Sequence, residues 1–231
     1  MTSSPSRIWE IDFFRGIAIL LMVAFHLIFD LTDFWGYNLN YMDGFWYYEG
    51  KLSAIMFTAT AGISSTLSFY HFRRGLVIFA WGMLITLATY FYNPQTYIRF
   101  GILHMLGSCM MLFPYIKNVK PGWLILTGTA AIASGQFTAQ LTIPSSLLLP
   151  FGITPSDYTS LDYYPLLPWS GFFLYGAALG QVLYKKRHSR LLQPSWLQPL
   201  TALGRHSLAV YLIHQPVLLA TLYVLHRFTN G

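Results

Sequence analysis

Long uncharged stretches divide this sequence into segments of the length that crosses a bilayer. A transmembrane helix needs about 20 mostly apolar residues, and six stretches without Asp, Glu, Lys or Arg reach or approach that length. An apolar run from Ile8 to about Phe29 precedes them and holds charged residues in its first turns. This pattern predicts an all-α, polytopic transmembrane bundle of about seven helices. The six stretches are residues 52–70, 75–98, 100–116, 121–156, 163–184 and 206–226.

One of these stretches is too long for a single crossing. Residues 121–156 contain three prolines in their second half, and proline interrupts a helix because it lacks the backbone N–H. We therefore expect residues 123–139 to cross the membrane and residues 140–163 to form an ordered extracytoplasmic or re-entrant loop. No internal repeat and no long polar segment is present, so residues 1–231 are predicted to form a single transmembrane domain.

The amino-acid composition supports the membrane assignment. Charged residues make up 10% of the chain and hydrophobic residues 55%, with a mean hydropathy of +0.47. Soluble domains contain about 25% charged residues, so this composition excludes a soluble globule, and its hydrophobicity excludes a disordered chain. The single cysteine, Cys109, lies in an apolar stretch, which excludes an intrachain disulfide and a cysteine metal site. No bound metal is expected.

The charged residues are distributed unequally between alternate loops. Because Lys and Arg concentrate on the cytoplasmic side of membrane proteins, we expect a multi-pass protein of the cytoplasmic (inner) membrane, with its N-terminus inside and its C-terminus outside. The net charge of +6 therefore reflects topology, and no nucleic-acid partner is expected. The expected cytoplasmic bases are Arg7, Arg73, Arg74, Lys117, Lys120, Lys185, Lys186, Arg187, Arg190 and Arg205, and the expected outer acids are Asp30, Asp33, Asp43, Glu49, Asp157 and Asp162.

The first apolar helix carries a stripe of polar residues on one face. Arg15 and His26 are eleven residues apart, so they differ by about 20° in direction and lie about 16 Å apart along the axis. Asp12 lies one turn before Arg15, and Asp30 lies one turn after His26. Ionisable residues inside a membrane are costly and are therefore candidates for function. Asp30 is a candidate to fix the tautomer of the His26 imidazole and to stabilise its protonated form.

Further polar residues lie on three other predicted helices. Arg99 and His104 open one helix near the expected outer interface, and Trp169 lies at the start of another. Structural roles compete with functional ones. A terminal arginine can extend to the interface, a buried histidine can bond a backbone carbonyl, and a tryptophan suits the interfacial belt. The last predicted helix adds Arg205, His206, Ser207, His214 and Gln215.

Four motifs, taken in order, resemble a known family. Residues 7–16 contain an Asp-x-x-Arg-Gly sequence that leads into an apolar helix with His26 near its end, and they resemble the opening of membrane acyltransferases. The later motifs are residues 99–107, 164–171 and 204–216. Together the four resemble bacterial proteins with a heparan-α-glucosaminide N-acetyltransferase catalytic-type domain, and the similarity extends over most of the chain.

The resemblance implies transfer of an acyl group, usually acetyl, from cytoplasmic acyl-CoA to a sugar amine or hydroxyl across the membrane. It implies a catalytic role for His26 and places the Asp-x-x-Arg motif on Asp12 and Arg15. The lysosomal heparan enzyme uses a histidine in the loop after its first helix, but residues 32–50 contain none here. The chemistry is therefore expected to use His26 or His104.

The residues themselves suit acyl transfer. A base must take the acceptor proton as the carbonyl is attacked, and a hydrogen-bond donor or cation must stabilise the oxyanion. The catalytic candidates are His26, Asp30, His104 and Arg99. The candidates for binding substrate or acyl-CoA are Asp12, Arg15, Arg205, His206, Ser207, His214, Gln215 and Trp169.

Three other functions fit the same polar residues. A transporter or flippase would use the stripe as a proton or substrate path, a haem protein would use histidines as axial ligands, and a non-catalytic membrane subunit would need none of them. The expected partners are membrane lipid, a glycan or other small acceptor, and acyl-CoA as a donor substrate, with no bound cofactor. The small residues Gly176 and Gly180 fit packing within the bundle or between copies of a homo-oligomer.

Overall fold

A computed structural model of the chain describes residues 7–229, and its fold is all-α, as predicted. Each of the seven predicted spans contains a long helix, and a short helix precedes the last one. The elements are α1 (Trp9–Asp33), α2 (Gly44–Leu67), α3 (His71–Tyr92), α4 (Ile102–Ile116), α5 (Pro121–Thr138), the 3-10 helix η1 (Ser146–Phe151), α6 (Leu166–Leu183), the 3-10 helix η2 (Ser195–Leu197), α7 (Gln198–Arg205) and α8 (Ser207–Thr229).

The described chain forms two compact units. The first unit contains residues 7–57 and 187–229, and the second contains residues 58–186. The first half of α2 therefore belongs to the first unit and the second half to the second unit. The expectation of a single domain stays a prediction, and each unit is described by itself below.

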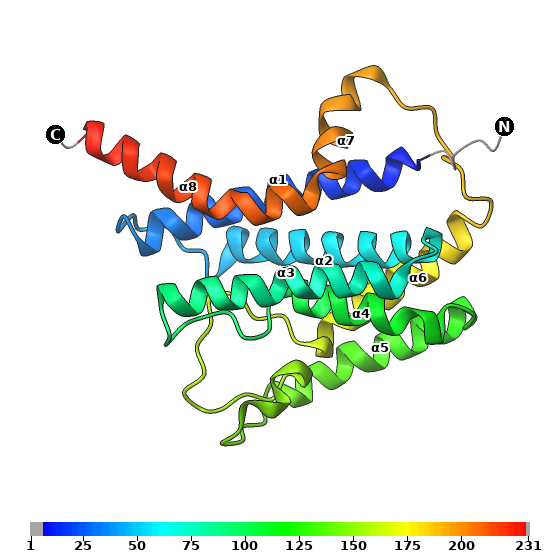
Figure 1. The fold of residues 1–231 in the computed structure, drawn as a ribbon, viewed down its shortest axis with the longest axis horizontal. Helices are drawn as coiled ribbons and strands as arrows, with labels where there is room; N and C mark the ends of the chain where they lie inside the picture. The colour runs from blue at the N-terminus through cyan, green and yellow to red at the C-terminus, as the bar shows by residue number, and fades with distance from the viewer. Residues whose placement is uncertain (1–6, 230–231) are drawn as a thin grey trace. The chain divides into compact units, whose positions relative to one another are not determined.

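In the first unit, α7 lies across the N-terminal part of α1, and α8 runs beside α1 (Figure 1). Two glycines allow the close approach of α7. A Cβ on Gly204 would overlap the backbone oxygen of Asp12, and a Cβ on Gly16 would overlap the backbone oxygen of Leu200. This backbone contact fixes the start of α8, which follows α7 directly, relative to α1.

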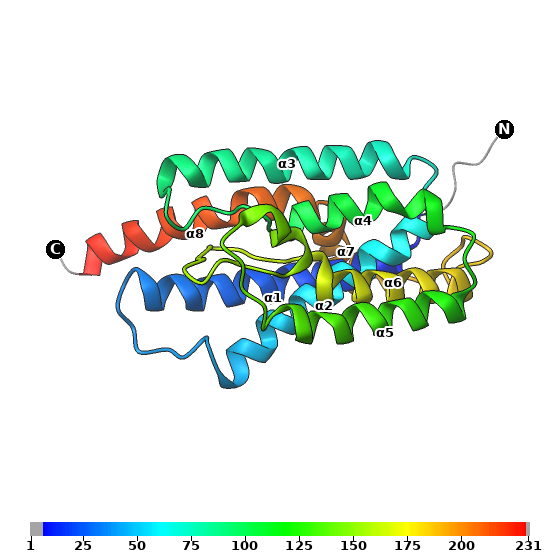
Figure 2. The same cartoon turned by 90° about the horizontal axis from the view of Figure 1, so that it is seen from below.

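In the second unit, α5 and α6 run side by side, and so do α3 and α4 (Figure 2). Glycines again mark the closest approaches. A Cβ on Gly176 in α6 would overlap the backbone oxygen of Ala59 in α2. Gly180, one turn later in α6, faces Ile63, which also lies on α2. The small-residue face of α6 therefore packs inside the bundle, which is one of the two arrangements that its sequence allows. A homo-oligomer stays a prediction.

The segment from residue 140 to residue 163 contains little regular structure but makes specific contacts. It holds η1 and a single parallel bridge between Thr142 and Thr154. The Tyr163 hydroxyl donates to the Leu149 carbonyl at 2.7 Å. The segment is thus tied to itself by hydrogen bonds, as an ordered loop should be. Its expected place on the outer side or within the membrane stays a prediction.

The lengths and surfaces of the helices are those of a membrane protein. Within residues 7–229, α1, α3, α6 and α8 are long and apolar enough to cross a membrane, and α4 is a shorter apolar helix. The helix α3 exposes a dense set of large apolar side chains, which suits contact with lipid and not with water. The count of seven crossings and their orientation stay predictions. The exposed α3 residues include Leu76, Val77, Trp81, Met83, Leu84 and Leu87.

Replacing Gly176 with alanine is expected to lower the unfolding temperature of the purified protein in detergent. The added methyl group must displace the α2 backbone at Ala59, and overpacking of this kind costs about 1–3 kcal/mol. The matched control is Gly122→Ala in α5, where a new Cβ meets nothing within 4 Å. Thermal unfolding followed by circular dichroism measures both variants. Equal unfolding temperatures would contradict the close contact of α6 with α2.

Candidate functional site

Two histidines from different helices meet in the first unit. His26 lies on α1 and His214 on α8, and their ring centroids are 4.7 Å apart with the ring planes at 78°. His214 is only 9% exposed. The polar stripe on the first helix pointed to His26, whereas His214 was expected only among the binding residues. The structure joins the two imidazoles into a pair.

Backbone carbonyls determine which nitrogen of each ring carries a hydrogen. Nδ1 of His26 lies 2.8 Å from the Met22 carbonyl oxygen, and Nδ1 of His214 lies 2.6 Å from the Tyr211 carbonyl oxygen. Because a carbonyl oxygen can only accept, each Nδ1 must be the donor. In the neutral rings, Nε2 then carries the lone pair, so both imidazoles have the tautomer of a base that acts through Nε2. The backbone bond and the base role therefore coexist.

The carboxyl of Asp30 bonds to α8 and not to His26. Gln215 Nε2 donates to Asp30 Oδ1 at 2.6 Å, and Asp30 is fully buried, at 0% exposure. The expectation that Asp30 fixes the His26 tautomer is therefore corrected, because the Met22 carbonyl does so. The spacing of four residues puts both side chains on one face of α1, but the donor that meets Asp30 comes from the neighbouring helix.

Several polar atoms beside the histidine pair have no hydrogen-bond partner among the residues that the structure describes. They are Asp30 Oδ2, His214 Nε2 and Gln215 Oε1. Buried polar atoms are normally paired, and an unpaired one requires an explanation. We define His26, Asp30, His214 and Gln215 as the histidine-pair site.

Ion pairs gather at the N-terminal end of α1. Arg7 Nε donates to Asp12 Oδ2 at 2.7 Å, and Arg15 Nη1 lies 3.6 Å from Asp12 Oδ1. The contact of Gly204 with the Asp12 backbone brings the next residue, Arg205, to the same end of α1. Arg7 and Arg15 therefore pair with the buried Asp12 carboxylate, and Arg205 lies at the same end of α1, about 16–21 Å along the helix axis from His26.

A carboxyl to which the sequence pattern gives no role holds the basic segment beside this end. Glu10 Oε1 accepts from the backbone N–H groups of Arg190 and Leu191 at 2.6 and 3.1 Å. Trp9 Nε1 donates to the Leu191 carbonyl at 2.9 Å. The first turn of α1 thereby anchors the chain that enters α7. An acidic residue at the apolar start of a helix was the available indication of this anchor.

His104 uses both ring nitrogens inside the second unit. The Gly101 backbone N–H donates to His104 Nδ1 at 3.2 Å, so Nε2 carries the hydrogen and faces Thr86 Oγ1 at 3.2 Å. The residue is 2% exposed, and its bond to Gly101 closes the N-terminus of α4. This geometry favours a structural role for His104, although the sequence made it a catalytic candidate.

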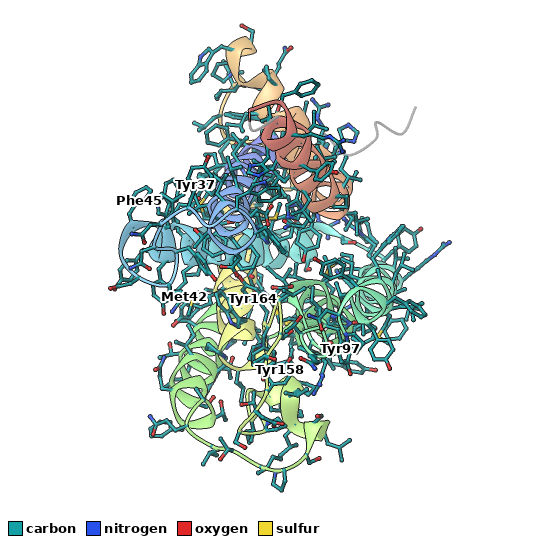
Figure 3. All side chains as sticks on the ribbon, turned by 90° about the vertical axis from the view of Figure 1, so that its left-hand side faces the viewer. Tyr37, Met42, Phe45, Tyr97, Tyr158 and Tyr164 are labelled. Atoms are coloured by element: carbon teal, nitrogen blue, oxygen red, sulfur yellow. The ribbon has the colours of Figure 1, made fainter. Side chains whose placement is uncertain are left out.

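Aromatic rings surround Arg99 in the second unit. Its guanidinium carbon lies 4.8 Å from the ring centroid of Tyr97 and 5.3 Å from that of Tyr158, and Figure 3 labels both tyrosines in the same region. Arg99 Nη1 also donates to Ser146 Oγ at 3.3 Å. Burial raises the pKa of the Tyr158 phenol, although the charge of Arg99 acts to lower it. Cation–π contacts and a hydrogen bond thus hold Arg99.

The remaining predicted residues are spread over both units. Trp169 packs against Tyr164, with ring centroids 4.6 Å apart, inside the second unit. Among the described side chains, no group of three His, Cys, Asp or Glu lies close enough to hold a metal ion. The first unit holds His26, Asp30, His214, Gln215, Asp12, Arg15, Arg205, the exposed His206 and the buried Ser207, and the second holds Arg99, His104 and Trp169.

The fold and the histidine-pair site define an integral membrane protein with acid–base groups held between its helices. Residues 7–216 match the family described as heparan-alpha-glucosaminide N-acetyltransferase, catalytic. This match covers most of the chain, so the protein belongs to that family, whose activity is that of a membrane acyltransferase. No curated protein and no solved structure matched the chain. The matched residues include all four members of the histidine-pair site.

Replacing Gln215 with leucine is expected to destabilise the protein by about 1–3 kcal/mol, because Asp30 Oδ1 loses its donor while it stays buried. Asp30→Leu should have a similar effect. The double variant should lose less than the sum of the two single variants, because neither buried partner is then left alone. Denaturation in mixed detergent micelles measures this cycle. Additive losses would contradict the bond between α1 and α8.

Proposed function

We propose that this protein transfers an acyl group, usually acetyl, from cytoplasmic acyl-CoA to an amine or hydroxyl of a sugar on the outer side of the cytoplasmic membrane. The contact of His26 with His214, in a member of an N-acetyltransferase family, is the observation that carries the proposal. The polar stripe of α1 supports it, because the stripe joins a basic end to the histidine-pair site.

The tautomers of the pair supply the base. As the acceptor nitrogen or oxygen attacks the thioester carbonyl, Nε2 of one histidine takes the acceptor hydrogen. The new bond joins the acceptor to the acyl carbon, and the carbon–sulfur bond breaks. The thiolate of CoA then takes the proton from the imidazolium, which returns the pair to its neutral state. Only one ring needs to hold the proton at a time, since two cations at this separation repel.

Gln215 suits the stabilisation of the oxyanion. One hydrogen of its amide nitrogen is directed to Asp30, and an amide nitrogen carries two hydrogens. We assign the second hydrogen to the oxygen of the tetrahedral intermediate, where a fixed donor lowers the barrier. Arg99, which the sequence made a candidate for this role, is held by Tyr97, Tyr158 and Ser146 in the second unit.

The basic end of α1 suits the phosphates of CoA. Guanidinium groups bind phosphate through two parallel hydrogen bonds, and Arg15 and Arg205 lie at this end. The thiol arm of an extended CoA would run along the stripe toward His26, about 16 Å away along the helix axis. Acyl-CoA is a diffusible donor substrate in this proposal and not a bound cofactor.

Replacing either His26 or His214 with alanine is expected to reduce acyl transfer about 10²–10⁴-fold, which is the usual contribution of a general base. The measurement is transfer from radiolabelled acetyl-CoA to D-glucosamine in proteoliposomes. His226→Ala is the control, because this histidine is exposed near the C-terminal end of α8. Full transfer by a folded variant that lacks both His26 and His214 would overturn the assigned roles. Passage of unmodified glucosamine without acetylation would indicate a transporter.

Replacing Arg15 with glutamine is expected to raise the KM for acetyl-CoA about 10-fold or more, because a charged hydrogen bond to phosphate is lost. The KM for glucosamine should not change. Arg227→Gln, near the end of α8, serves as the charge-matched control. Initial rates at several concentrations of each substrate separate the two constants. A change only in the KM for glucosamine would place the donor elsewhere.

A further inference from the structure

A buried carboxyl on α2 belongs to the first unit but has no role in the proposed chemistry. Glu49 is 7% exposed, and neither of its carboxyl oxygens has a hydrogen-bond partner in the described part of the chain. The sequence pattern placed Glu49 in an outer loop. The structure instead places it in the second turn of α2, because this helix begins at Gly44. Burying a carboxyl without hydrogen-bond partners costs free energy, unless a ligand donates hydrogen bonds to its oxygens.

Two contacts set the height of Glu49 relative to α1. Ser53 Oγ donates to the Ala18 carbonyl at 2.8 Å, and a Cβ on Gly50 would meet the ring of Phe25. The later residue of α2, Ser53, meets the earlier residue of α1, Ala18, whereas Gly50 meets Phe25, so the two helices are antiparallel. Glu49 precedes Gly50 by one residue and Ser53 by one turn. This register puts Glu49 beside the turn of α1 that ends at His26.

Glu49 also lies on the inward face of its helix. Ser53 is one turn along the same face and is 5% exposed, whereas Tyr48 on the other side is 68% exposed. Phe57, two turns from Glu49, stacks on Tyr211 of α8 with ring centroids 6.5 Å apart. Helix α2 thus contacts α1 through the face that carries Glu49 and Ser53, and α8 through Phe57; α1 and α8 are the two helices that carry the histidine pair.

The unpaired atoms at this height have one chemical property in common. All of them are oxygen atoms that accept hydrogen bonds, and none has a donor within residues 7–229. They are the two carboxylate oxygens of Glu49, Asp30 Oδ2 and the amide oxygen Gln215 Oε1. An ionised carboxylate and an amide oxygen cannot donate. Asp30 is about 6 Å beyond His26 along α1. A molecule that completes this group must bring several N–H or O–H hydrogens. Polyols and amines have this property.

We propose that Glu49 is an acceptor-binding residue, which receives hydrogen bonds from N–H or O–H groups of the acyl acceptor other than the group that is acylated. This inference rests on the proposed acyl transfer, and it names the acceptor as a molecule with several hydrogen-bond donors. Glu49 holds the acceptor from α2, while the histidine pair on α1 and α8 takes the proton. The carboxyl is a binding residue and does not take part in the bond exchange.

The test compares two acceptors that share an amine and differ in their hydroxyls. D-Glucosamine offers several O–H donors, and cyclohexylamine offers none besides its amine. Glu49→Gln keeps the shape of the side chain but removes its charge and one acceptor oxygen. Asp43→Asn is the matched control, because Asp43 is an exposed carboxylate just before α2. Thermal unfolding of each variant confirms that it is folded.

We expect Glu49→Gln to raise the KM for glucosamine about 10-fold or more, since a hydrogen bond to a charged group is lost. The KM for acetyl-CoA and the rate with cyclohexylamine should stay within about twofold of the parent. A structural role for Glu49 would instead lower the rate with both amines equally. That result, or an unchanged KM for glucosamine in a folded variant, would overturn the proposal.

A binding measurement separates this inference from the proposed function. Glucosamine should raise the unfolding temperature of the parent protein in detergent, and this rise should be lost in Glu49→Gln. Protection that depends on Glu49, without any acetyl transfer, would refute the proposed function and leave the recognition by Glu49 standing. Acetyl transfer with protection that does not depend on Glu49 would refute the inference and leave the function standing.

Discussion

The absence of water inside a bilayer decides where polar groups of this protein can be placed. A polar atom there must bond within the protein, and most helix side chains obey this rule locally. Ser64 donates to the Thr60 carbonyl and Thr89 to the Ile85 carbonyl, each one turn back. His26 follows the same rule through Nδ1. Because Nδ1 bonds to the backbone carbonyl of its own helix, Nε2 of the neutral ring keeps a lone pair that can accept a proton. Local hydrogen bonding and an available base are therefore two results of a single constraint.

The sequence predicted the helices well, because long apolar runs report burial in lipid directly. It also made His26 a candidate, since a titratable group in an apolar helix stands out by itself, and the catalytic role of His26 stays a prediction. It did not predict the partner of Asp30. The spacing along α1 favoured His26, but the bond is made with Gln215, 185 residues away. Contacts between helices depend on the rotation and relative height of both helices, and the spacing of residues within one helix determines neither.

Glu49 shows how a boundary error conceals a site residue. The uncharged stretch begins after Lys51, so a helix counted from there leaves Glu49 in a loop. In the structure α2 begins at Gly44, and residues 45–50, which precede Lys51, are mostly aromatic. Such residues fit the border of a membrane, so the helix extends beyond its uncharged part. The added turns bring a carboxyl inside, where its charge matters more than in a loop.

The height of the histidine pair is set far from the pair itself. Gly204 meets the backbone of Asp12, and α8 begins three residues later. From these two points α1 and α8 run side by side, and the rings of His26 and His214 meet with centroids 4.7 Å apart, about 21 Å beyond Asp12 along α1. Backbone contact at a glycine leaves little freedom for sliding. The glycine that packs α7 on α1 therefore also determines whether the two imidazoles meet, although it touches neither of them.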